Sequence, residues 1–98
     1  MKVFISKRAG RAVARINARW HAKADDPEIF IREYLAAIDY LESVEKPGTP
    51  FPTEKRPHLK RTVLPKSHCH IYFDIDERKQ MVRVLHVWDA RRERPPKL

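Results

Sequence analysis

The period of the apolar residues changes once along this chain, and that change constrains the fold more than any other feature. Between residues 7 and 44 the apolar residues recur at steps of three and four, as on one face of a helix. Between residues 68 and 76 they alternate singly, as in a strand. The connector EKPGTPFPTEKRPH, which lies between these regions, holds four of the eight prolines and excludes regular helix or central strand. The chain is therefore expected to place its helices before most of its strands.

Two helices are expected, over residues 7–24 and 27–44. Asp26 is placed to cap the second helix, and Pro27 to be its first residue, where the missing N–H costs nothing. Since only a few residues separate the helices, they should form an antiparallel hairpin. Their predicted core positions are Ala9, Val13, Ile16 and Trp20 in the first helix, and Phe30, Tyr34, Ala37, Ile38 and Leu41 in the second.

Strands are expected on both sides of the helices. KVFIS precedes them, KRTVLP follows the connector, and HCHIYFDID and MVRVLHVWD flank the polar turn DERKQ. MVRVLHVWD is apolar on both faces, which is typical of a central or covered strand. The expected faces of HCHIYFDID are Cys69, Ile71, Phe73 and Ile75 toward the core, and His68, His70, Tyr72 and Asp74 away from it.

The fold class that follows is α+β, in the order strand–helix–helix–strand–strand–strand. A helical hairpin packs on one face of a small, twisted, largely antiparallel sheet. The expected core contacts join Ile71, Phe73 and Leu85 to Val13, Ile16, Leu35 or Ile38. No helix remains for the other face of the sheet, which is either solvated or a working surface.

Length and composition limit the possible functions. With 98 residues, one domain over residues 1–98 is expected. Two isolated glycines cannot form a phosphate-binding loop, and no apolar run could span a bilayer, so no membrane partner is expected. One cysteine permits no internal disulfide and fits the cytoplasm. A net charge of +8 favours a polyanionic or acidic partner, the alternative being solubility alone.

One group of candidate anion-binding residues lies on the first predicted helix. Arg8, Arg11, Arg15 and Arg19 share an arc of about 80° on that helix. They form either a ridge of cations for an acidic helix or a phosphate backbone, or a solvated polar face.

A second group, Arg91, Arg92 and Arg94, directly follows the last predicted strand. A guanidinium offers a fixed fork of donors that holds phosphate or carboxylate with two bonds. The group is interpreted as an anion-holding or catalytic cluster, or else as a basic tail that protects a sheet edge. Asp89 and Glu93, which lie among these arginines, are expected to pair with them.

Neither a metal nor a cofactor is expected. His68 and His70 would share one face of a strand while Cys69 points to the other, and zinc needs three or four protein ligands. His86 could add one ligand, but there is no second cysteine. Cys69 is interpreted as a small buried hydrophobe rather than a nucleophile.

The end of the chain, HIYFDIDERKQMVRVLHVWDARRERPP, together with the element order and the charge, resembles the RelE/ParE superfamily of toxins from type II toxin–antitoxin modules. The resemblance covers nearly the whole chain. It implies a microbial-RNase-like α+β fold and a cognate antitoxin whose C-terminal segment wraps the toxin. RelE-like members cut mRNA in the ribosomal A site, whereas ParE-like members of such plasmid-stabilising modules bind and block DNA gyrase and lack the nuclease residues.

The resemblance carries over to individual residues only in part. RelE-like nucleases have an arginine in the third strand, where this chain has His70, and another past the last strand, where Arg92 matches best and Arg91 is possible. Lys60 and Arg61 match the basic residues of the second strand, and a tyrosine expected near the end has no counterpart. The ParE-like interpretation is therefore favoured.

If the chain is RelE-like instead, the catalytic residues would be His70, His86 and Arg92, since histidine can serve as acid or base in RNA cleavage. A third possibility is a non-toxic module that binds nucleic acid or a partner.

Overall fold

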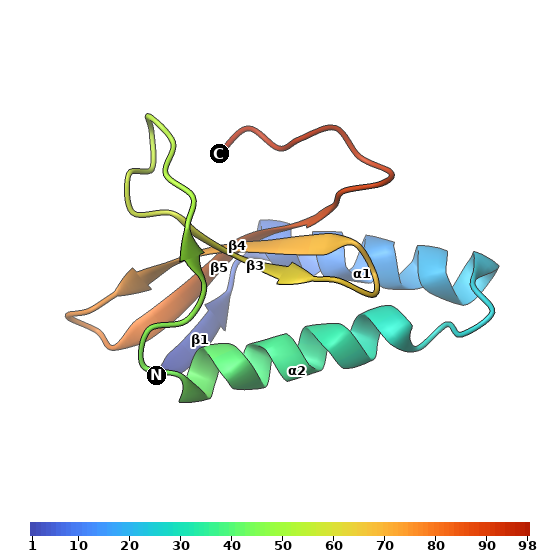
Figure 1. Cartoon of the computed structure of the whole chain (residues 1–98), viewed down its shortest axis with the longest axis horizontal. Helices are drawn as coiled ribbons and strands as arrows, with labels where there is room; N and C mark the ends of the chain where they lie inside the picture. Colours follow the sequence, from blue (N-terminus) through green and yellow to red (C-terminus); the bar gives the residue numbers. More distant parts are fainter.

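The computed structural model describes all 98 residues and confirms the α+β fold class (Figure 1). The strands form one five-stranded sheet in the order β1-β5-β4-β3-β2, in which only the β1–β5 pair is parallel. The short edge strand β2 lies in the proline-rich connector. The elements are β1 (Lys2–Ile5), α1 (Lys7–Lys23), α2 (Ile29–Ser43), β2 (Thr49–Pro50), β3 (Lys60–Leu64), β4 (Cys69–Asp76) and β5 (Met81–Asp89).

The two helices begin by different local means. The Ser6 hydroxyl accepts a hydrogen bond from the Ala9 amide at 3.0 Å and caps α1. The prediction that Asp26 caps the second helix and Pro27 opens it was wrong by two residues, because Glu28 occupies the N-cap of α2. The Asp26 carboxylate accepts from the Glu28 amide at 3.2 Å in the turn that precedes the helix. The α2 helix therefore begins two residues later, at Ile29.

Neither helix has the length and apolar character that a bilayer-spanning helix needs.

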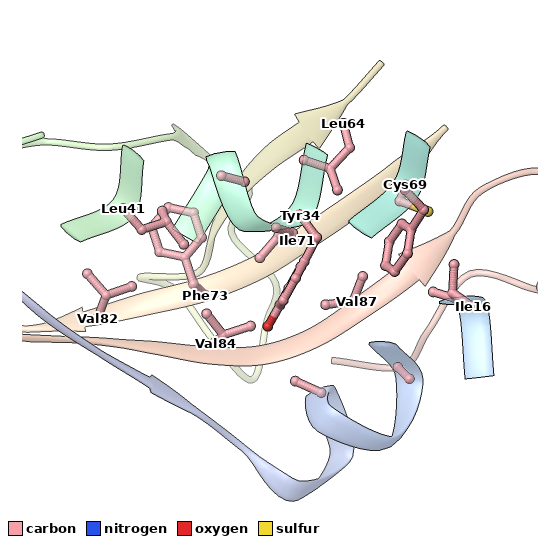
Figure 2. Packing of buried hydrophobic residues seen from close by; sticks show 14 residues of the cluster. Ile16, Tyr34, Leu41, Leu64, Cys69, Ile71, Phe73, Val82, Val84 and Val87 are labelled. Atoms are coloured by element: carbon pink, nitrogen blue, oxygen red, sulfur yellow. The ribbon is translucent and has the colours of Figure 1, made fainter. Parts of the chain in front are cut away.

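The core lies between the helical hairpin and the sheet, as Figure 2 shows. Ile71 and Phe73 of β4 and Ile16 of α1 are fully buried, which confirms their predicted positions. Val13 and Ile38 pack at the edge of this cluster. The fully buried β5 residues that complete the core are Val82, Val84 and Val87.

Two residues expected in the core lie elsewhere. In the β4–β5 ladder Tyr72 pairs with His86 and Phe73 with Val84, so Leu85 is an extra, unpaired residue. This β-bulge breaks the alternation of β5, and Leu85 is only partly buried. Leu35 is 56% exposed on the outer side of α2. The predicted core contacts of Leu85 and Leu35 were therefore wrong.

The helix-free face of the sheet is partly covered, contrary to the expectation of a bare face. The connector after β2 and the segment after β5 both pass on the side of the sheet opposite to the helices (Figure 1). The Thr53 hydroxyl donates to the Leu98 carbonyl at 3.1 Å and so joins the two segments. The ring of Phe51 packs on Tyr72 at 5.5 Å between centroids, and Tyr72 is only 2% exposed.

Candidate functional site

The arginines of α1 do not form one free ridge. Arg15 binds the Glu93 carboxylate through Nε at 3.1 Å and through a terminal nitrogen at 2.6 Å. Arg8 and Arg11 are exposed and make no ion pair. The predicted ridge is therefore interrupted at its third member.

Arg19, the fourth arginine of the predicted ridge, also lies beside carboxylates. A terminal nitrogen of Arg19 lies 3.5 Å from Asp89 Oδ2 and 3.4 Å from Glu93 Oε2. Both distances are too long for strong hydrogen bonds, and Arg19 keeps buried N–H groups without a partner. Asp89 and Glu93 thus pair with arginines, as expected, but with those of α1 rather than with their neighbours in the sequence.

Glu93 is the residue that joins the end of the chain to α1. Its carboxylate accepts from Arg15 and, at 3.0 Å, from the Asp89 amide, while its backbone carbonyl accepts from the Trp88 indole at 3.1 Å. Burial opposes ionisation of this group, but the bond from the Asp89 amide and the charges of Arg15 and Arg19 outweigh it. The pKa of Glu93 is therefore lowered from its ordinary value.

The turn between Asp89 and Glu93 carries the arginine cluster. The amides of Arg92 and Glu93 both donate to the Asp89 carbonyl, at 3.2 and 3.1 Å, and the Arg91 amide donates to the Asp89 carboxylate at 3.2 Å. The side chains of Arg91 and Arg92 are exposed. The backbone of this cluster is fixed while its guanidinium groups remain available.

Arg91 and Arg92 line a hollow of about 170 Å³ between this turn and the C-terminal end of α1. Four cationic side chains therefore meet around one half-buried indole. The lining residues are Arg19, Trp20, Lys23, Ala24, Arg91 and Arg92. The sequence indicated three of them, whereas Lys23 was not singled out and Trp20 was assigned to the core stripe. Arg94 is exposed further along the segment and does not line the hollow.

A separate group of aromatic rings lies on the helix-free face. The His70 ring packs edge-on against Trp88, with centroids 5.1 Å apart, and lies 6.3 Å from Tyr72. The guanidinium of Arg61 lies 4.5 Å above the Phe51 ring, a cation–π contact. Burial and the nearby charge of Arg61 lower the pKa of His70.

His86 lies beside this group, because it pairs with Tyr72 across the ladder. Burial, with the charges of Arg8 and Arg15, lowers the pKa of His86, and Glu93 only partly opposes them. His86 and His70 are therefore both neutral at pH 7, with a buried Nδ1 that has no partner. Two neutral imidazoles offer bases, but neither supplies the protonated acid that RNA cleavage also needs.

Lys60 and Cys69 lie apart from these groups. Lys60 pairs with Phe73, whereas the next residue, Arg61, pairs with Tyr72, so the two lie on opposite faces of β3. Cys69 is fully buried, as predicted, and burial raises the pKa of its thiol to about 12. No three of the chain's His, Cys, Asp and Glu side chains gather into a group that could hold a metal ion.

The structural comparison gives one informative result. The crystal structure of the isolated RelE toxin of E. coli superposes with a TM-score of 0.52 over 94% of this chain and 86% of that chain, at 15% sequence identity. The fold is RelE-like. No protein-family model matches the sequence, and no curated protein matches it significantly. At this identity the likeness concerns the path of the chain, and the activity has to be argued from the residues.

Proposed function

We propose that this protein is the toxin of a type II toxin–antitoxin module, that it acts ParE-like by blocking DNA gyrase, and that a cognate antitoxin neutralises it. The RelE-like fold over 94% of the chain supports the toxin part of the proposal. The net charge of +8 supports it further, because such a field attracts an acidic antitoxin segment and speeds association.

The arrangement of the candidate residues favours the ParE-like activity over cleavage. Arg92 lines the hollow beside the C-terminal end of α1, whereas His70 packs against Trp88 on the helix-free face of the sheet. A nuclease has to bring its phosphate-holding arginine and its acid and base to one scissile bond. The pKa values of His70 and His86 are both lowered, so neither is an imidazolium acid at pH 7. A toxin that acts by binding needs neither arrangement.

The alternative is a RelE-like endoribonuclease that cuts mRNA on the ribosome. The aromatic group on the helix-free face favours it, since rings such as Tyr72 and Trp88 beside Arg61 are suited to stacked bases. In that case His70 or His86 would act as the base and Arg92 would hold the phosphate.

Controlled expression in bacteria without the antitoxin tests the proposal. A gyrase-directed toxin should cause filamentation and a DNA-damage response before protein synthesis falls. Immediate arrest of translation with mRNA cut in frame would establish the alternative instead. Normal growth at a verified protein level would contradict both and leave a non-toxic binding module.

A further inference from the structure

The hollow between α1 and the Asp89–Glu93 turn has the composition of a binding hot spot for a protein partner. It combines the half-buried indole of Trp20 with the guanidinium groups of Arg19, Arg91 and Arg92. Tryptophan and arginine are the residues that most often carry the binding energy of protein interfaces. Lys23 adds a fourth charge.

The size of the hollow restricts what it can take. A volume of about 170 Å³ is below the range of about 300 to 1,000 Å³ that is usual for pockets that enclose small molecules. It suits one side chain or one anionic group of a larger partner. The forked donors of two exposed arginines match a carboxylate, which each can hold through two parallel bonds.

The charges around the hollow argue for a protein rather than for a nucleic-acid backbone. A backbone needs a track of free cations along successive phosphates. Here the track along α1 is interrupted, because Arg15 is bound to Glu93, and Arg19 lies beside Asp89 and Glu93. Lys23, Arg91 and Arg92 make no ion pair and line the same hollow, which is an arrangement suited to a single carboxylate.

We propose that this hollow binds an aspartate or glutamate side chain of an acidic protein segment, with Trp20 packing on its methylene groups, and that Glu93 is the positioning residue that holds the hollow open. The proposal rests on the proposed function, which it deepens by naming the chemical group that the toxin recognises in a protein partner. Glu93 acts through the turn. Its bonds to Arg15 and to the Asp89 amide fix the backbone from which the side chains of Arg91 and Arg92 extend.

A titration followed by NMR tests the binding site directly. The probe is a short blocked peptide of alternating glutamate and leucine, and its control has glutamine in place of glutamate. The Trp20 indole N–H, assigned with Trp20→Phe, reports occupancy. The acidic peptide should shift this signal to saturation, and Arg91→Ala/Arg92→Ala should raise its Kd by about tenfold or more, which corresponds to about 1.4 kcal/mol.

Arg78→Ala/Lys79→Ala is the matched control, since it removes the same charge at the exposed β4–β5 turn and should change Kd by less than about twofold. Equal shifts from the two peptides, or no saturation at Trp20, would overturn the proposal. So would tighter binding of oligodeoxythymidylate at the same signals, because the site would then be one for phosphate.

A second pair of variants tests the positioning role. Arg15→Ala removes the anchor of Glu93 and leaves the cations that line the hollow, whereas Arg11→Ala removes an unpaired charge from the same helix. Arg15→Ala should raise the Kd of the acidic peptide severalfold and should increase the ¹⁵N-detected mobility of the Arg91 and Arg92 amides. Arg11→Ala should do neither. Equal effects of the two variants would mean that only the overall charge matters.

The peptide titration tests the binding site separately from the expression experiment, which tests the proposed function. Saturable binding of the acidic peptide without growth arrest would leave the site standing and refute the proposed function. Growth arrest by gyrase block without such binding would refute the binding site and support the proposed function.

Discussion

Replacement of Glu93 by glutamine should loosen the end of the chain and leave the rest of the fold intact. The carboxylate accepts two bonds from Arg15, at 3.1 and 2.6 Å, and one from the Asp89 amide at 3.0 Å. Glutamine has only one side-chain oxygen, which is neutral. If it accepts from the Asp89 amide, an NH2 group faces Arg15, and if it accepts from Arg15, an NH2 group faces the Asp89 amide. Hydrogen bonds to charged groups contribute about 1.5 to 3 kcal/mol.

The Arg15 side chain is 48% exposed, so solvent screening reduces that figure, and we expect a loss of about 1 to 2 kcal/mol in the free energy of unfolding. For a chain of this length such a loss lowers Tm by about 4 to 16 °C. Urea titrations of the wild type, Glu93→Gln, Arg15→Ala and the double variant form a double-mutant cycle. The coupling energy of the pair should exceed about 0.5 kcal/mol.

The effect should also depend on pH in one direction. The pKa of Glu93 is lower in the folded protein, so its stabilisation is complete above the unfolded-state pKa and disappears as pH falls through the folded-state pKa. The difference in stability between the wild type and Glu93→Gln should therefore be constant near pH 7 and shrink below about pH 4.3. An undiminished difference at pH 3, or a coupling energy indistinguishable from zero, would refute the argument.

Four further predictions concern the stability of the fold and the burial of its core. Gly48→Ala should destabilise the fold by about 2 to 4 kcal/mol in denaturant titration, because φ is +74° there and a Cβ would lie 2.5 Å from a carbon of the Phe73 ring. Gly10→Ala, in an open stretch of α1, should instead stabilise the fold by about 1 kcal/mol. If both substitutions changed stability in the same direction, the reasoning for this pair would be contradicted. Phe73→Ala should cost about 3 to 5 kcal/mol, and a loss under 1 kcal/mol would mean that its burial contributes little. Cys69, with its pKa near 12, should react with a thiol reagent at pH 7 to 8 only as the protein unfolds, and rapid labelling of the folded state would argue against its burial.

Periodicity was sufficient to predict the layers of the fold. Most predicted core positions are buried, and Ala9, Ile16, Phe30, Leu41, Cys69, Ile71 and Phe73 are fully so. Val13, Trp20, Ile38 and Ile75 are partly buried and pack against this core. Such patterns follow from local geometry, because a residue and its third or fourth neighbour share a helix face. The central place of β5 also followed from its apolar character on both faces.

The errors in β5 and in the site arose where distant parts of the chain act on one another. Arg15 and Glu93 are separated by 78 positions, and no spacing rule indicates that they meet. The bulge at Leu85 depends on the register of β4 against β5, which periodicity cannot fix to one residue. The hollow could be predicted only in part for the same reason: the sequence indicates Arg91 and Arg92, but only folding brings Trp20 and Lys23 beside them.

The proposed block of DNA gyrase through Arg91 and Arg92 of the hollow can be tested directly in vitro. The direct measurement is the supercoiling of relaxed plasmid by purified gyrase in the presence of the wild-type protein or of Arg91→Ala/Arg92→Ala. We expect the wild type to inhibit supercoiling at a low molar excess. The double variant should melt within a few degrees of the wild type, because exposed substitutions usually change stability by less than about 0.5 kcal/mol, and it should inhibit far less. Unimpaired supercoiling with the wild-type protein, together with cleavage of mRNA on ribosomes that it is added to, would contradict the account.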